Sequence, residues 1–174
     1  MENLKVLITE AELQKRISEL AEQITKDYNG QDVTFICILK GSVFFTVELA
    51  KNIEGDVKLE FIRVSSYGEG TESTGEIKMK LDLKDSIQGK DVIIIEDIID
   101  TGRTLSYLIE YLKMKKPNSV RLCALLDKPE RRVKKEVKVD YTGFQIPDKF
   151  VVGYGLDWDE KYRNLPYIGY IENV

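Results

Sequence analysis

Apolar residues along the chain follow two recurring patterns, continuous runs and stretches with helical spacing. Near-continuous runs, which are typical of parallel strands buried on both faces, occupy residues 33–39 (VTFICIL), 92–95 (VIII) and 120–126 (VRLCALL). Helical spacing marks residues 13–28, 43–50 and 105–112. This alternation of buried strands with helices predicts an α/β fold, a doubly wound and mainly parallel sheet with flanking helices.

The first predicted helix and the strands between the long runs carry further signals. Thr9-Glu10-Ala11-Glu12 is a capping box for a helix start, and Gly30 supplies the stop. Shorter strands are predicted at 57–64, 77–83 and 150–154, and in the final YIGYIE. Small polar residues run from Ser65 to Gly75, with Tyr67 as their one aromatic side chain. Such a long loop is typical of a lid; the alternative is a surface loop with a passive tyrosine.

Composition and net charge restrict the partners and the cellular location that we expect for the chain. The chain has 174 residues and a net charge of −4, which fits one domain without general attraction to nucleic acid or an anionic membrane. No apolar run approaches the roughly 20 residues of a membrane helix, and the first residues lack a signal-peptide layout, so we expect a cytoplasmic location. Cys37 and Cys123 lie in apolar runs and are predicted to be reduced thiols.

Histidine is absent from the sequence. This excludes Ser-His-Asp and Cys-His catalysis and all histidine-ligated metals. A general base must therefore be a carboxylate or a lysine. Any metal must be held by oxygen, with Mg²⁺ as the default.

The most informative stretch is Val92 to Leu105, VIIIEDIIDTGRTL. We expect a buried strand that ends at Glu96 and Asp97, a loop over 100–104, and a helix whose free N–H groups can hold a phosphate. Three acids so close together need a metal ion or a sugar diol beside that phosphate. A ribose 5-phosphate fits both needs, and the alternative is an acidic strand end that caps a helix.

Charged residues also follow other predicted strands. Lys40, Lys128 and Asp157 come after strand-like runs, and the carboxyl ends of parallel strands meet at one edge, where ligands bind. For Lys40 the alternative is a turn lysine in solvent. The basic run over 130–138 (ERRVKKEVK) could contact RNA, but a solvated face or an oligomer contact is the favoured interpretation.

Five segments in this order resemble the hypoxanthine-guanine phosphoribosyltransferases of the short bacterial type, over most of the chain. The segments are 39–41 (LKG), 65–68 (SSYG), 94–105 (IIEDIIDTGRTL), 127–128 (DK) and 150–154 (FVVGY). The resemblance implies the type I phosphoribosyltransferase fold as a single domain over 1–174. It further implies a core over about 30–155, a small hood built from about 1–10 and 156–174, and a mobile lid over about 65–76.

The resemblance assigns one group of residues to the ribose and its phosphates. Asp100 to Thr104, which include Thr101, Gly102 and Arg103, match the 5-phosphate cradle. Glu96 and Asp97 match the acids on the ribose diol and its Mg²⁺, and Asp157 matches a second magnesium ligand. The pyrophosphate contacts match Arg163 and the Lys40-Gly41 pair, where a cis peptide follows Leu39.

A second group is assigned to the purine and to closure of the site. Asp100 matches the general base beside the purine imidazole nitrogen, and Lys128 matches the donor to the 6-oxo group. Phe150 matches the ring that stacks on the base, while Val151 supplies backbone contacts. Ser66 and Tyr67 fall in the segment that matches the lid. Ser42, Arg103 and Trp158 depart from the family pattern without removing a reacting group.

The implied activity is purine salvage by Mg²⁺-dependent transfer of a 5-phosphoribosyl group. The donor would be phosphoribosyl pyrophosphate, the acceptor hypoxanthine or guanine, and the products IMP or GMP and pyrophosphate. We expect a homodimer or homotetramer, with no nucleic acid or membrane partner. One rival is an RNA-binding regulator on the same fold that senses phosphoribosyl pyrophosphate. Another is a phosphotransfer receiver domain, whose acids should follow the first strand and not a central one.

Overall fold

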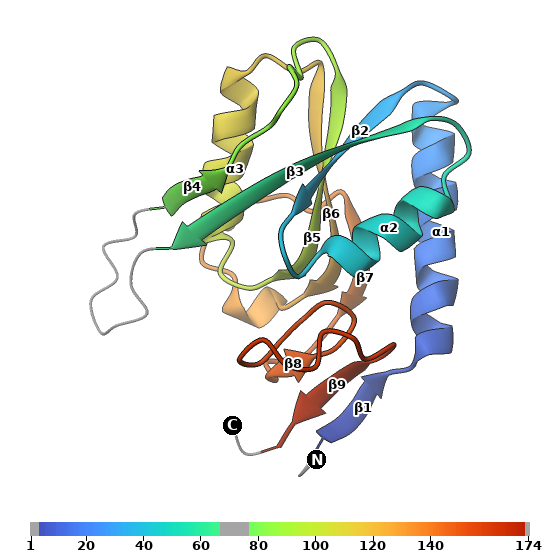
Figure 1. Ribbon diagram of the computed structural model, residues 1–174, viewed down its shortest axis with the longest axis vertical. Coiled ribbons are helices and arrows are strands. Elements are labelled where there is room, and N and C mark those ends of the chain that lie inside the picture. The colour runs from blue at the N-terminus through green and yellow to red at the C-terminus, as the bar shows by residue number, and fades with distance from the viewer. Residues whose placement is uncertain (1–3, 67–76, 173–174) are drawn as a thin grey trace.

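The computed structural model describes residues 4–66 and 77–172 as two sheets with flanking helices (Figure 1). The larger sheet has six strands in the order β4-β3-β2-β5-β6-β7, and only the β3–β4 pair is antiparallel. The strands are β2 (Val33–Ile38), β3 (Val57–Ser66), β4 (Ile77–Leu81), β5 (Asp91–Ile99), β6 (Ser119–Asp127) and β7 (Tyr141–Gln145). The predicted doubly wound, mainly parallel sheet is confirmed.

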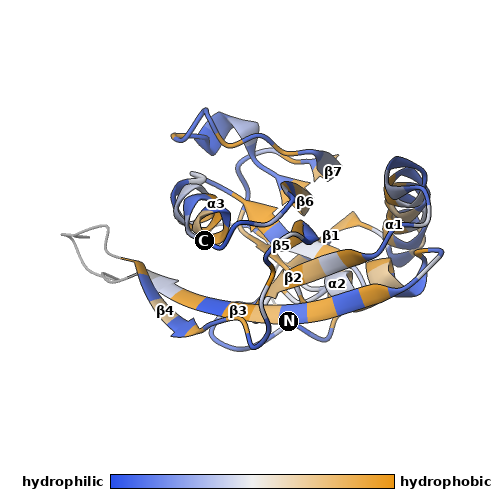
Figure 2. Ribbon diagram, turned by 90° about the horizontal axis from the view of Figure 1, so that it is seen from above, coloured by the Kyte–Doolittle hydropathy of each residue, from blue (hydrophilic) through white to orange (hydrophobic). Residues whose placement is uncertain are grey.

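Helices cover both faces of this sheet. α1 (Glu10–Tyr28) and α2 (Val43–Lys51) pack on one face, and α3 (Arg103–Met114) packs on the other. Figure 2 shows α1 and α3 on opposite sides of the apolar strands. Alternate residues of β5 serve the two cores: Ile93 and Ile95 face α1, whereas Ile94 faces Leu105, Leu108 and Leu112 of α3. This two-sided burial explains the continuous apolar runs in the sequence.

The ends of α1 match the sequence signals closely. The Thr9 side chain accepts a hydrogen bond from the Glu12 N–H, and the Glu12 carboxylate accepts one from the Thr9 N–H at 2.8 Å, which completes the capping box. The helix ends at Tyr28, with Asn29 as its C-cap in the left-handed conformation (φ 47°), and the predicted stop Gly30 follows directly with φ 76°. Cys37 and Cys123 are buried free thiols, as predicted.

The strand order of the large sheet reverses between β2 and β5, which are parallel neighbours. From β2 it crosses through α2 to β3 on one side, and from β5 it crosses through α3 to β6 on the other. Loops that leave two neighbouring strands in opposite directions open a crevice at their carboxyl ends, which is where open α/β sheets bind ligands. Lys40 and Gly41 follow β2 at this point, and Asp100 to Thr104 follow β5.

A second, antiparallel sheet lies beyond the carboxyl ends of the parallel strands (Figure 1). It has the order β1-β9-β8 and joins β1 (Leu4–Ile8), β8 (Val151–Val152) and β9 (Ile168–Ile171). Leu4 pairs with Ile171, so segments from the two ends of the chain lie side by side. The small hood built from chain ends thus exists, although the expected domain limits remain a prediction.

Some elements differ from the sequence expectations. β5 does not end at the acids but continues through Glu96 and Asp97 to Ile99, because its pairing with β6 extends to Ile99 and Asp127. β1 and β7 were not anticipated, and β8 is shorter than the predicted strand over 150–154. Tyr67 and most of the expected lid lie outside the described residues. None of the described helices combines the length and the apolar character needed to cross a membrane.

Candidate active site

Glu96 and Asp97 lie side by side near the end of β5. Glu96 is buried and accepts a hydrogen bond from the Asp97 N–H at 3.0 Å. Burial raises the pKa of Glu96 well above its ordinary value, and the neighbouring Asp97 charge raises that pKa further. Burial also raises the pKa of Asp97, although the nearby Arg163 acts in the opposite direction. The pair is therefore costly to keep charged without an added cation or hydrogen-bond donor.

Gly41, Asp97 and Gly155 bring three segments into direct contact. A Cβ on Gly41 would collide with the Asp97 carboxylate, and a Cβ on Gly155 would collide with the Gly41 carbonyl. The peptide between Leu39 and Lys40 is cis, as the resemblance implies. Because only glycine leaves room for these approaches, the turn after β2 packs against both β5 and the segment that follows β8.

Arg163 lies beside this junction. Its Nη1 donates to the Gly155 carbonyl at 2.7 Å, and its Nη2 is 2.9 Å from Asp157 Oδ1. The Arg163 Nε is buried without a hydrogen-bond partner in the part of the chain that the structure describes. A buried donor of this kind is suited to an incoming anion.

Glu160 connects the two cations that were predicted to hold pyrophosphate. Its carboxylate lies 3.0 Å from Lys40 Nζ and 3.3 Å from Arg163 Nη2. The predicted residues Lys40, Arg163 and Asp157 are thus brought together around Glu160. Sequence reasoning missed Glu160; its spacing of three residues before Arg163 was the available signal.

The loop after β5 forms a small cavity at the start of α3. The cavity has a volume of about 160 Å³ and is lined by Glu96 and by residues 98–105. Gly102 takes the N-cap position in a left-handed conformation (φ 81°), and no side chain caps the helix. The Arg103 N–H donates to Thr101 Oγ1 at 3.4 Å, and the N–H groups that follow it in the first turn of α3 are left for a ligand. The helix dipole favours an anion there. The predicted cradle residues Thr101, Arg103 and Thr104 all line this cavity.

The segment after β6 holds the loop that follows β5 through hydrogen bonds. The N–H groups of Val133 and Lys134 both donate to the Thr101 carbonyl at 3.0 Å. Arg132 donates from Nε to the Asp100 carbonyl at 3.2 Å and forms an ion pair with the buried Asp127. The interpretation of 130–138 as a solvated face or oligomer contact is therefore wrong for Arg132, whose side chain is 13% exposed and turns inward onto the loop.

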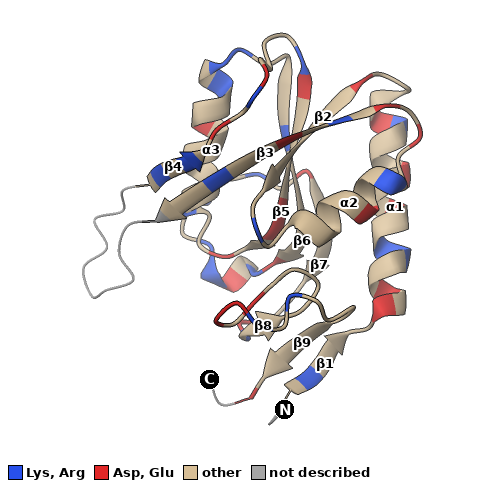
Figure 3. Cartoon of the chain, viewed as in Figure 1, with Lys and Arg blue, Asp and Glu red and all other residues tan. Residues whose placement is uncertain are grey.

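Asp100 and Lys128 follow neighbouring strands and are joined through other charges. Arg131 Nε donates to Asp100 Oδ1 at 2.9 Å, and Arg131 Nη1 is 3.5 Å from Asp148 Oδ2. Asp148 Oδ1 in turn lies 3.3 Å from Lys128 Nζ, and the Lys128 side chain is only 10% exposed. Figure 3 shows acidic and basic residues together where β5 and β6 end.

The predicted stacking ring lies on the rim of the same region. Phe150 is 41% exposed, and its ring meets Trp158 edge-on with centroids 6.2 Å apart. Val151 is buried in β8. An exposed phenylalanine with one open face can stack on a planar base.

The structure leaves part of the predicted site untested. Tyr67 and the Ser66 side chain lie outside what the structure describes. Among the described residues, no group of three or more acidic or cysteine side chains is close enough together to hold a metal ion. The predicted set of Glu96, Asp97 and Asp157 is therefore not a preformed cage, and these roles stay predictions.

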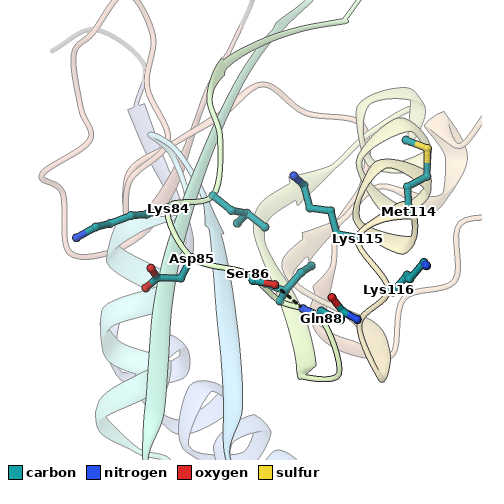
Figure 4. A pocket seen from close by; sticks show the side chains of 9 residues that line it. Lys84, Asp85, Ser86, Gln88, Met114, Lys115 and Lys116 are labelled. Atoms are coloured by element: carbon teal, nitrogen blue, oxygen red, sulfur yellow. Dashed lines mark hydrogen bonds between the residues drawn. The ribbon is translucent and has the colours of Figure 1, made fainter.

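Another cavity, of about 480 Å³, lies at the opposite end of β5 and is lined by residues 83–88 and 114–116. Its basic side chains do not converge. Figure 4 shows Lys84 and Asp85 pointing away from Lys115, while Lys116 points in a further direction. Lys115 Nζ instead forms an ion pair with Asp82 Oδ2, at 3.5 Å. The carboxyl edge of the sheet remains the better candidate.

Comparisons with known proteins show what the chain as a whole is similar to. The model of the phosphoribosyl transferase domain family matches residues 8–159. A hypoxanthine-guanine phosphoribosyltransferase of Bacillus subtilis is 49% identical over 168 residues, which are 97% of this chain and 93% of that protein. A bifunctional TilS/HprT protein of Listeria monocytogenes is 51% identical, but the chain spans only 26% of its length.

Solved structures show the same likeness. A hypoxanthine phosphoribosyltransferase from Staphylococcus aureus has a TM-score of 0.92 and 50% identity, covering 97% of this chain and 91% of that one. A hypoxanthine-guanine phosphoribosyltransferase from Bacillus anthracis also has a TM-score of 0.92, with 49% identity, and covers 98% of this chain and 99% of that one.

Proposed function

The chain belongs to the phosphoribosyltransferase family, and from that membership we propose that it is a hypoxanthine-guanine phosphoribosyltransferase of purine salvage. It would transfer the 5-phosphoribosyl group of phosphoribosyl pyrophosphate to hypoxanthine or guanine, giving IMP or GMP and pyrophosphate. One observation carries the proposal. The loops after β2 and β5 meet at the switch point of the sheet, so that a pyrophosphate contact and a phosphate cradle lie on either side of Glu96 and Asp97.

The phosphate-binding parts would act through position and charge. The uncapped start of α3 would hold the 5-phosphate, while Lys40, Gly41 and Arg163 would hold the pyrophosphate. When the bond to the anomeric carbon breaks, positive charge builds on the ribose ring and negative charge on the leaving pyrophosphate. Fixed cations beside the leaving group stabilise that charge as it develops. The segment over 65–76 would close over the reactants and exclude water.

Asp100 and Lys128 would bind the imidazole ring and the 6-oxo group of the purine. Asp100 would accept the proton from one imidazole nitrogen while the other imidazole nitrogen attacks the anomeric carbon and pyrophosphate leaves. Lys128 would donate to the 6-oxo oxygen, and its side chain is almost fully buried. Adenine carries an amino group at this position, so it would leave the buried ammonium unpaired, which is unfavourable. Phe150 would stack on the base.

Mg²⁺ is the proposed cofactor, and the donor set suits it. Glu96, Asp97 and Asp157 offer hard oxygen ligands, and the raised pKa values of the first two indicate an unmet need for positive charge. Since these side chains do not form a closed cage, the reactants' own oxygens would complete the coordination. When bound, the ion would neutralise the phosphates and orient the ribose hydroxyls.

The direct test is to incubate the protein with phosphoribosyl pyrophosphate, Mg²⁺ and each purine base in turn. We expect IMP and GMP and no AMP. Asp100→Asn should lower kcat by roughly 10²–10⁴, the range for loss of a general base, while the Kd for IMP changes little. Wild-type turnover in that variant would show that Asp100 is not the general base. If none of the purine bases gave a nucleotide, the proposal would be refuted.

We also propose that the protein is a homo-oligomer. Phe44 and Val47 of α2 and Leu59 and Phe61 of β3 are each at least 40% exposed, although all four are large apolar residues. A second copy would cover them, and Phe44 also contacts the Tyr154 ring beside the site (centroids 6.2 Å apart). Light scattering should show at least a dimer, and Phe61→Glu should shift it toward the monomer. A monomeric wild type would contradict this.

The regulator on the same fold is the weaker candidate. Its basic run would have to face RNA, but Arg131 and Arg132 point onto the chain's own loop. The negative net charge and the presence of Lys128, Phe150 and Arg163 also favour catalysis. We therefore expect no salt-sensitive RNA binding in a filter-binding assay.

A further inference from the structure

Four charged side chains form a continuous chain across the region assigned to the purine. In order they are Asp100, Arg131, Asp148 and Lys128, and each is within 3.5 Å of the next. Asp100 follows β5, Lys128 follows β6, and Arg131 lies in the short 3₁₀ helix Pro129–Arg131. We refer to these four residues as the charge chain.

The charge chain occupies the groups that the purine would need. Arg131 contacts both carboxylate oxygens of Asp100, at 2.9 Å through Nε and 3.5 Å through Nη2. The acceptor proposed for the purine proton is therefore already engaged. At the other end, the ammonium group proposed for the 6-oxo oxygen is engaged by Asp148.

Arg131 can move without disturbing the fold. Its side chain is 48% exposed, and the structural contact beside it is made by Arg132, which holds the Asp100 backbone and Asp127. Hydrogen bonding to Asp100 raises the pKa of Arg131, so the guanidinium stays charged at any working pH. The two arginines thus have different roles. Arg132 holds the backbone of the loop after β5, and Arg131 covers the Asp100 carboxylate.

We propose that Arg131 is a positioning residue that closes the empty purine site by linking Asp100 to Asp148, and that the purine must displace it. The inference rests on the proposed function. Each purine bound breaks the Asp100–Arg131 contact and frees Lys128 from Asp148, so the charge chain lowers affinity for the base. Until a purine arrives, it keeps the general base away from other proton donors.

The test compares two ligands in equilibrium binding. IMP fills both the phosphate cradle and the purine site, whereas ribose 5-phosphate fills only the cradle. Arg131→Gln should lower the Kd for IMP about two- to fivefold, the scale of an exposed ion pair, and leave the Kd for ribose 5-phosphate unchanged. Lys135→Gln removes the same charge from an exposed neighbour and should change neither.

Two further readouts separate a displaced contact from a merely structural one. The difference in IMP affinity between wild type and Arg131→Gln should shrink as salt rises, because exposed ion pairs are screened. Asp148→Asn, which frees Lys128 and leaves Arg131 held by Asp100 alone, should likewise tighten IMP. In both variants the KM for hypoxanthine should fall more than kcat changes.

Three outcomes would overturn the proposal or its premise. Weaker ribose 5-phosphate binding in Arg131→Gln would make Arg131 a phosphate ligand. An unchanged Kd for IMP in both variants would show that the charge chain does not oppose the purine. A wild-type protein that binds neither ligand and forms no nucleotide would instead refute the proposed function itself.

Discussion

Replacing Glu96 with glutamine should stabilise the ligand-free protein. Glu96 is 9% exposed, and within the described residues it forms no ion pair. Its charged form is opposed by burial and by Asp97. A buried polar group whose charge is poorly compensated costs about 1–3 kcal/mol, and the amide of glutamine keeps the shape while removing that charge. We therefore expect a gain of about 1–3 kcal/mol at neutral pH.

The gain should depend on pH in a defined direction. Because folding raises the pKa of Glu96, the wild type loses stability as pH rises from the unfolded value of about 4.5 through the folded value. Below that window Glu96 is protonated in both states, and the two proteins should be equally stable. The difference should therefore be absent in acid and largest at neutral pH.

The assay is urea unfolding at several pH values after EDTA treatment, with thermal unfolding as a second measure. Each kcal/mol corresponds to about 2–4 °C in Tm for a chain of this size. Glu54→Gln, at an exposed position, is the matched control and should change little. Equal stability at neutral pH, or a gain that grows on acidification, would show that the Glu96 charge is not costly in the empty site. Turnover should nevertheless fall, since the carboxylate is assigned to the ribose diol.

Three other predictions are simpler. Gly155→Ala should push the Gly41 carbonyl away and raise the KM for phosphoribosyl pyrophosphate. Gly55→Ala is the control, because Gly55 has a similar positive φ but open space around it. An equal effect in both variants would assign the change to backbone strain alone. Lys128→Ala should reduce the preference for 6-oxo purines over adenine by at least about tenfold, and unchanged selectivity would contradict its assignment. Thr9→Ala should cost about 0.5–2 kcal/mol in urea unfolding without affecting KM, because it removes the α1 cap and none of the residues assigned to the site.

The fold could be predicted where the sequence pattern is dictated by local physics. The strands β2, β5 and β6 are buried on both faces and so leave continuous apolar runs, and α1 carries a complete capping box. β1 and β7 were missed for the opposite reason. β7 contains Gly143 and only moderate burial, and it forms because β6 offers an edge to pair with, which no local pattern reveals.

The site was predictable in its residues but not in their partners. Lys40, Asp100 and Lys128 could be placed at one edge because each follows a parallel strand. Of their counter-charges, Glu160 and Asp148 lie in irregular segments and Arg131 lies in the short 3₁₀ helix, and their approach depends on tertiary packing. The basic run over 130–138 illustrates the limit, because its composition predicts a solvated face but does not reveal that the N–H groups of Val133 and Lys134 donate to the Thr101 carbonyl.

The antiparallel β1-β9-β8 sheet has a consequence for biosynthesis. The six-stranded sheet is complete once Gln145 has left the ribosome, but β9 is translated only after the turns that carry Gly155 and Arg163. A nascent chain could therefore form the phosphate cradle before it can grip a leaving pyrophosphate. Formation of the large sheet and acquisition of pyrophosphate binding would be separate events, since a chain that ends at Gln145 contains every strand of that sheet but neither Gly155 nor Arg163.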